Sequence, residues 1–199
     1  MNIQFKIIYN DFGDYAVDLL NRNKFYISRH RKVTKKELND IQMERGTNFC
    51  VFAFDDDVCV GMVGAYYISC QTVAKPYQIF MDTMLVDKLY NFNPIVLKGL
   101  LENAIRKIYE FGHTREIIAE VSPDNIASFR ILRRYGFLIL EDKTDFYGYI
   151  RLHNFIPSIV HFFDINLEEI ISSKRLYNFL PKLKKMIIQN AVIIIKRIL

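Results

Sequence analysis

The sequence predicts an α/β domain of ordinary size with a short helical extension. Its 199 residues are 51% apolar, which is enough to bury a substantial core. Segments with the two-residue period of strands alternate with segments that have the period of helices, and one helix carries both start and stop signals. We therefore expect a folded domain over residues 1–152 and a helical extension over residues 153–199, packed on the core or at an interface.

The expected elements follow one another in a simple order. A strand near 3–9 precedes helices near 14–21 and 34–45, and a hairpin follows with strands near 49–54 and 58–68. Its turn is marked by three successive acids: Asp55, Asp56 and Asp57. The domain then continues with a strand near 78–86, a helix near 94–111, a strand near 116–121, a helix that opens at 122, and strands near 137–141 and 146–152 around the polar stretch 142–145. In the extension, helices are expected near 166–179 and 182–198.

The helix that opens at residue 122 is the best-marked element of the chain. Its start shows a capping residue, a proline suited to the first helical position and an acid that complements the helix dipole: Ser122, Pro123 and Asp124. Its end shows two basic residues, a glycine for the left-handed position and an apolar closure: Arg133, Arg134, Gly136 and Phe137. Apolar residues expected on one face recur every three positions: Ile126, Phe129, Leu132 and Tyr135.

Composition narrows the classes of partner. The net charge of +5 is modest, and the densest basic run, residues 29–32, carries no nucleic-acid motif, so we expect no nucleic-acid partner. The three cysteines, Cys50, Cys59 and Cys70, form no closely spaced pair of metal ligands, and the four histidines have no metal-site spacing either, so we expect no metal. Because the amino terminus lacks a signal-peptide pattern, the expected compartment is the cytoplasm.

The same helix carries a family resemblance. Asn125 is followed after three residues by Ser128 and after eight more by the pair Gly136 and Phe137. This pattern resembles the fourth helix of the GNAT superfamily of acyl-CoA-dependent N-acyltransferases, and the order of expected elements is similar to that family over residues 1–152. The resemblance implies a mixed, mostly antiparallel sheet flanked by helices. It also implies that the sheet splays between its fourth and fifth strands, which end here near residues 86 and 121, to admit the pantetheine arm of the donor.

The resemblance places the donor at the end of the strand near 78–86. It implies that backbone groups of Met84, Leu85 and Val86 bind the acyl carbonyl and the pantetheine. It further implies that the side of the helix carrying Asn125 and Ser128 borders the pantetheine or adenosine portion of the donor. Capping or helix packing is the alternative interpretation of these two residues.

The phosphate turn departs from the family pattern. In the family, an arginine or glutamine and two small residues form a turn whose N–H groups hold pyrophosphate at a helix N-terminus. Here Phe92 occupies the position of the arginine or glutamine, and Ile95 and Leu97 occupy the small positions. Asn93 still resembles an N-cap, after which Ile95, Val96 and Leu97 could offer free N–H groups to an anion. The alternative is that these residues only start a helix and fill core space.

Asp82 is the candidate catalytic base. Amine attack on a thioester requires a route for the lost proton, and Asp82 lies on the donor-site strand with the same facing parity as Met84 and Val86. Partial burial that raised its pKa would let it accept this proton directly or through water. The alternative is an ordinary hydrogen bond at a strand end. At the position where the family often supplies an acid tyrosine, this chain has Leu132, so no general acid is assigned.

The leading hypothesis is an N-acyltransferase that moves an acetyl or other acyl group from acetyl-CoA or another acyl-CoA to a primary amine of unknown identity. Two alternatives stay open: a noncatalytic binding or scaffolding domain derived from the same fold, and an acyltransferase that uses an acyl-carrier-protein donor. The basic and aliphatic segment 182–199 suggests either peripheral contact with a membrane surface or packing on the core or at a homo-oligomer interface.

Overall fold

The computed structural model describes most of the chain up to residue 154. The described ranges are 2–9, 13–23, 32–44, 47–66, 68–69, 72–73, 78–91, 93–110, 116–144 and 149–154. The two helices expected near 166–179 and 182–198, and the interface or membrane role expected for them, lie outside these ranges. The division into a domain over 1–152 and an extension over 153–199 therefore stays a prediction.

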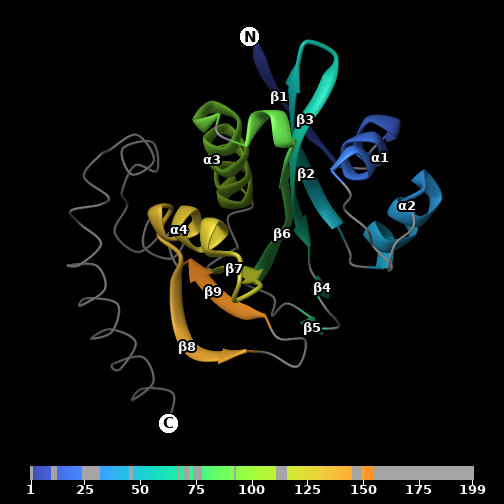
Figure 1. Cartoon of the computed structure of the whole chain (residues 1–199). Helices are drawn as coiled ribbons and strands as arrows, with labels where there is room; N and C mark the ends of the chain where they lie inside the picture. The colour runs from blue at the N-terminus through green and yellow to red at the C-terminus, as the bar shows by residue number, and fades with distance from the viewer. Residues whose placement is uncertain are drawn as a thin grey trace.

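The long strands and the helices follow one another in the expected order (Figure 1). In chain order they are β1 (Ile3–Ile8), α1 (Gly13–Arg22), α2 (Lys35–Glu44), β2 (Thr47–Asp55), β3 (Val58–Tyr66), β4 (Ile68–Ser69), β5 (Thr72–Val73), β6 (Gln78–Val86), the 3₁₀ helix η1 (Lys88–Tyr90), α3 (Pro94–Glu110), β7 (Glu116–Val121), α4 (Ile126–Arg134), β8 (Leu138–Thr144) and β9 (Ile150–Asn154).

One seven-stranded sheet, in the order β1-β2-β3-β6-β7-β9-β8, organises the molecule. Its neighbouring strands are antiparallel except β6 and β7, which are parallel and are joined through the α3 crossover. The mixed, mostly antiparallel sheet flanked by helices is therefore confirmed. A second sheet, formed by the short strands β4 and β5, was not expected from the sequence.

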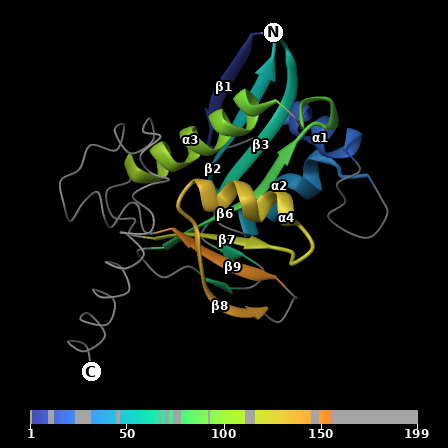
Figure 2. The same cartoon turned by 60° about the vertical axis from the view of Figure 1, so that its left-hand side comes forward.

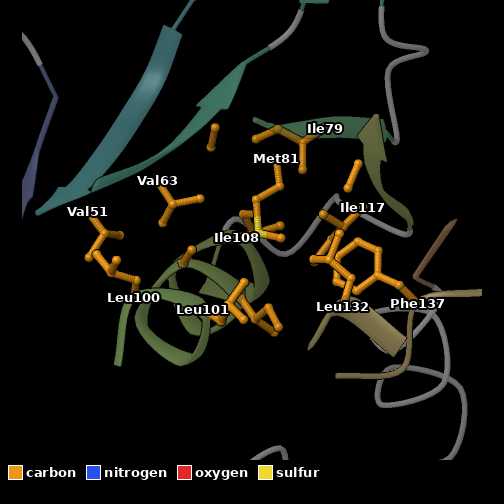
Figure 3. Packing of buried hydrophobic residues seen from close by; sticks show 14 of the residues in the cluster. Val51, Val63, Ile79, Met81, Leu100, Leu101, Ile108, Ile117, Leu132 and Phe137 are labelled. Atoms are coloured by element: carbon orange, nitrogen blue, oxygen red, sulfur yellow. The ribbon is translucent and has the colours of Figure 1, made fainter. Parts of the chain in front are cut away.

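The helices cover both faces of the sheet (Figures 1 and 2). α3 and α4 lie on one face, where Leu100, Leu101 and Leu132 pack with strand residues in the larger hydrophobic cluster (Figure 3). α1 lies on the other face, where Leu19 and Leu20 join a second buried cluster. We call these the α3 face and the α1 face. Burial of each such leucine contributes about 2 kcal/mol, so both faces stabilise the sheet.

The start of α4 differs from the sequence prediction. Ser122 does not cap the helix: its carbonyl accepts a hydrogen bond from Asn125 N (2.9 Å) and closes a turn that contains Pro123. The helix begins later, at Ile126, and its N-cap is Asn125, whose side chain accepts from Ser128 N. Ile126 is 59% exposed, so it does not belong to the buried face as expected.

The end of α4 matches the prediction. Gly136 has a φ of 86°, and Phe137 N donates to the carbonyl of Leu132 (3.1 Å) while Gly136 N donates to that of Arg133 (3.2 Å). These two bonds define a Schellman motif, and Phe137 and Leu132 pack in the same cluster. The end is also tied to the sheet, because the buried side chain of Asn154 donates to the carbonyl of Tyr135 (2.8 Å).

Three strand boundaries also differ from the sequence prediction. β8 runs through to Thr144, so most of the polar stretch expected to separate the last two strands belongs to a strand. β9 starts at Ile150 rather than near residue 146. β3 ends at Tyr66, and Ile68 belongs to the separate strand β4. β8 is an outer strand of the sheet, a position in which polar residues are tolerated, so polarity alone did not mark its end.

Replacing Asn125 by alanine tests the revised start of α4. Removing the side-chain acceptor of Ser128 N should lower the free energy of unfolding by about 1 kcal/mol, measured by urea denaturation. Asn125→Asp should preserve most of the stability. Ser122→Ala is the matched control and should change the free energy by less than about 0.5 kcal/mol. A larger loss in Ser122→Ala than in Asn125→Ala would contradict the assigned cap.

Candidate functional site

β6 and β7 separate after a short paired stretch. Their parallel pairing comprises Gln78 with Glu116, Ile79 with Ile117, and Phe80 with Ile118. Beyond these pairs, β6 continues to Val86 along β3, whereas β7 continues to Val121 along β9. The two strands therefore diverge toward their carboxyl ends, and the expected splay between the fourth and fifth long strands is confirmed.

A β-bulge lies where the opening begins. Gly64 pairs with Asp82 and Met62 pairs with Leu85, so Thr83 and Met84 together face the single residue Val63. Thr83 has a φ of 54°, which is rare for a β-branched residue. The bulge therefore places a left-handed residue inside a strand that the sequence predicted to be regular.

The bulge interrupts the regular alternation of side chains along β6. Ile79 and Met81 pack on the α3 face before the bulge, and Met84 and Val86 pack on the same face after it. The alternation has thus reversed between residues 81 and 84, so the regular two-residue period from which the facing of Asp82 was predicted does not continue through Thr83. The side chain of Asp82 lies outside what the structure describes, so its catalytic role stays a prediction.

The three residues expected to bind the acyl carbonyl form the wall of the opening. Met84, Leu85 and Val86 are all half-buried. Met84 and Val86 contact the α3-face cluster, and Leu85 contacts the α1-face cluster. Their side chains therefore pack on both faces of β6.

The start of α3 is confirmed, with one change in its hydrogen bonding. The helix begins at Pro94, as predicted, and the side chain of Asn93 accepts from Ile95 N (2.9 Å). The N–H group of Ile95 is therefore engaged in a hydrogen bond, whereas the sequence predicted that it would be free. Val96 is fully buried, Leu97 is half-buried, and the Ile95 side chain is 59% exposed. Phe92 lies outside the described residues.

Asn125 and Ser128 are brought together by the cap of α4. The Asn125 side chain accepts from Ser128 N (3.1 Å), which is the capping alternative considered for them. Their contact with a donor stays a prediction. Leu132, at the tyrosine position of the family, is 2% exposed in the core. Nearby, burial raises the pKa of Tyr135 to about 12, so its phenol loses its proton less readily than an ordinary tyrosine does.

Sequence reasoning missed two carboxylates on β7. The Glu120 side chain is only 4% exposed, and its Oε1 accepts from Arg151 Nε on β9 (2.9 Å). Glu120 lies beyond the last β6 pair, so it stands at the opening. Glu116, at the closed end, contacts the side chains of His153 and Gln78. Two charged residues in an otherwise apolar strand were the available signal, but their partners depend on the register with β9 and β6.

A separate hollow lies beside the β2–β3 turn. Its volume is about 620 Å³, and it contains none of the predicted donor-site residues. Most of its charged groups are engaged: Arg22 pairs with Asp87 (3.1 Å), and the hydroxyl of Tyr90 donates to Asp55 (2.7 Å), which raises the pKa of Tyr90. This hollow is therefore mainly a hydrogen-bonded junction between α1, the hairpin and η1.

Other reactive groups are few in the described ranges. Those ranges contain no group of three or more His, Cys, Asp or Glu side chains arranged to hold a metal ion. Burial raises the pKa of the Cys59 thiol to about 12, so this cysteine is not an activated nucleophile. Among the helices within the same ranges, none is long and apolar enough to span a membrane.

Comparisons with known proteins agree with this geometry. A family model described as an acetyltransferase (GNAT) domain matches residues 10–138. The solved structure of the N-acetyltransferase YhbS from Escherichia coli with CoA is 16% identical, with 77% of this chain and 81% of that chain covered and a TM-score of 0.58. PaiA N-acetyltransferase from Thermoplasma acidophilum with CoA is also 16% identical, with coverages of 77% and 99% and a TM-score of 0.58.

A third similar structure contains an acceptor. The aminoglycoside acetyltransferase AAC(6')-Ib in complex with CoA and kanamycin is 12% identical, with 80% of this chain and 98% of that chain covered and a TM-score of 0.63. At these identities the structural likeness establishes the fold alone. A comparison with curated protein sequences finds no match.

The Glu120–Arg151 pair can be tested by removing the cation. Arg151→Gln should lower the free energy of unfolding by about 2 kcal/mol, because it withdraws a charged partner from a carboxylate with almost no solvent access. Arg151→Lys retains the charge and should lose less. The measurement is urea denaturation at neutral pH, and equal losses in the two variants would show that packing of the arginine, rather than its charge, supports Glu120.

Proposed function

Because the chain belongs to the GNAT acetyltransferase family, we propose that it transfers an acetyl or another acyl group from an acyl-CoA to a primary amine. The observation that carries this proposal is the opening between β6 and β7, bordered by the bulge at Thr83. An extended thioester arm entering this opening would run beside exposed strand edges. Such an arrangement suits donors whose reactive carbonyl must be held by backbone groups.

The acyl carbonyl would lie against the backbone of Met84, Leu85 and Val86. N–H groups directed at the carbonyl oxygen would stabilise the negative charge that develops when the amine attacks. The amine nitrogen forms a bond to the carbonyl carbon, the carbon–sulfur bond breaks, and CoA leaves as a thiolate that takes up a proton. The presence of CoA in the YhbS and PaiA structures supports this choice of donor.

The diphosphate end of the donor would lie near the starts of α3 and α4. Val96 and Leu97 supply N–H groups in the first turn of α3, and Lys98 is 63% exposed along that helix. Asn93 and Ile95 would border this end of the donor, and Asn125 with Ser128 would border it from α4. The exposed Ile95 side chain limits close approach, which predicts weaker diphosphate contacts than a glycine would allow.

The proposed acceptor is a small amine or an amino sugar, with peptide amines as a further class. The AAC(6')-Ib complex with kanamycin shows that a similar fold accommodates an amino sugar. Asp82 is the proposed base that receives the amine proton. Glu120 adds a carboxylate at the same opening, where its ion pair with Arg151 holds it in place. Self-association and contact of the carboxyl-terminal segment with a membrane surface stay predictions.

Direct binding of acetyl-CoA tests the donor assignment. Calorimetry on the full chain should show saturable binding, and Ile95→Gly should strengthen the binding of acetyl-CoA severalfold by admitting the diphosphate to the α3 N–H groups. Acetyl-pantetheine, which lacks the diphosphate, is the matched control and should bind both proteins alike. Absence of acetyl-CoA binding would favour a carrier-protein donor or a noncatalytic domain.

Asp82→Asn tests the proposed base. The rate of acyl transfer to an accepted amine should fall by at least about 100-fold, because the amide cannot take up the proton, while acetyl-CoA affinity should not change. Asp56→Asn is the control, because Asp56 is an exposed carboxylate in the β2–β3 turn. An unchanged rate for Asp82→Asn across pH would exclude Asp82 as the base.

A further inference from the structure

Thr83 adopts an unfavourable backbone conformation at the start of the opening. Its φ of 54° lies in the left-handed region, where β-branched residues are rarely found. Such a conformation persists only where the surrounding structure holds it. Because Thr83 also lies in the bulge of β6, the group that holds it determines the path of the strand on which the donor carbonyl would rest.

Tyr66 is placed to hold Thr83. Its side chain is fully buried on the α1 face with Phe80 and Ile118, and its hydroxyl donates to Thr83 Oγ1 (3.1 Å). The ring lies over Gly64, where an added Cβ would stand 2.3 Å from the Tyr66 hydroxyl oxygen. Gly64 is also the β3 partner of Asp82. Because Gly64 has no side chain, the Tyr66 ring can lie over it and reach from β3 to the bulge on β6.

We propose that Tyr66 is a positioning residue for the acyl carbonyl: it holds Thr83 in the left-handed conformation and thereby fixes the bulge backbone at Met84 and Leu85. This inference rests on the proposed function, because it assumes that the carbonyl lies against these residues. A bulge takes backbone groups out of the strand ladder and redirects them. Groups redirected toward the opening can bind a carbonyl oxygen only if the bulge keeps one conformation before the donor arrives.

The hydroxyl of Tyr66 is the part that carries this role. A phenylalanine ring would fill the same space against Phe80 and Ile118, so packing alone does not require the hydroxyl. Likewise, a valine would match the shape of Thr83 without supplying Oγ1. The two side chains therefore allow substitutions that remove the contact and preserve the volume of the core.

The first experiment measures how well the bulge is protected from hydrogen exchange when no ligand is bound. Amide hydrogen exchange of residues 83–85 should become about five- to tenfold faster in Tyr66→Phe and in Thr83→Val, because each loses the hydrogen bond that holds the bulge. Thr83→Ser retains a hydroxyl and should exchange like the natural protein. Tyr135→Phe, at the half-buried C-cap residue of α4, is the matched control. Unchanged exchange in Tyr66→Phe would overturn the inference.

The second experiment measures hydrogen bonding to the carbonyl of the bound donor. When [1-¹³C]acetyl-CoA binds the natural protein, hydrogen bonding to the thioester oxygen should move its ¹³C resonance downfield, and Tyr66→Phe should reduce this shift by about half or more. Adding Thr83→Gly to Tyr66→Phe should restore the shift, because glycine adopts the positive φ without the hydrogen bond from Tyr66. If the Tyr66 hydroxyl only stabilised the fold, Thr83→Gly would not restore the ¹³C shift.

The outcomes separate this inference from the proposed function. Loss of the shift in Tyr66→Phe and its recovery in the double variant support the positioning role of Tyr66. A full shift in Tyr66→Phe, or a reduced shift that Thr83→Gly does not restore, would overturn it. If the natural protein fails to bind acetyl-CoA, the proposed donor is wrong, and the positioning role falls with it even where hydrogen exchange shows that Tyr66 holds the bulge.

Discussion

The short parallel pairing between β6 and β7 determines the shape of the whole site. Both strands keep antiparallel partners on their outer edges, β3 for β6 and β9 for β7, so neither is lost from the sheet when they part. Helix α3 and residues from α4 fill the α3 face across the divergence and bury residues such as Leu101 and Leu132. Hydrophobic burial thus stabilises a sheet that is open along one strand interface. A fully paired sheet would not provide this opening.

Local signals predicted most of the elements, but they could not choose between neighbouring residues of the same kind. Ser122 and Asn125 are both good capping residues, and each precedes plausible first-turn residues. The turn that Ser122 closes with Asn125 decides between them, and that turn depends on how the chain leaves β7. By contrast, Gly136 had no nearby competitor for the left-handed position, and the end of α4 followed the prediction.

The candidate site was less predictable because it depends on register. The segment from Ile79 to Val86 reads as a regular strand, and no glycine marks the positive φ of Thr83. The reversal of facing at the bulge is therefore invisible until β3 is placed beside β6. The pairing of Glu120 with Arg151 is similar, since the partners are 31 residues apart and meet only through the β7–β9 register. The start of α3 was predictable, because Asn93 and Pro94 act locally.

The bond from the Asn154 side chain to the carbonyl of Tyr135 gives the molecule a preferred route for mechanical strain. Residue 154 ends β9, whose neighbours in the sheet are β7 and β8 and not β6. A pull applied at this residue would reach the end of α4 and the β7 side of the opening first. It would reach the β6 side only through the pairs that join β6 to β7. The segment that continues from residue 154 is therefore joined to the β7 wall of the opening before the β6 wall.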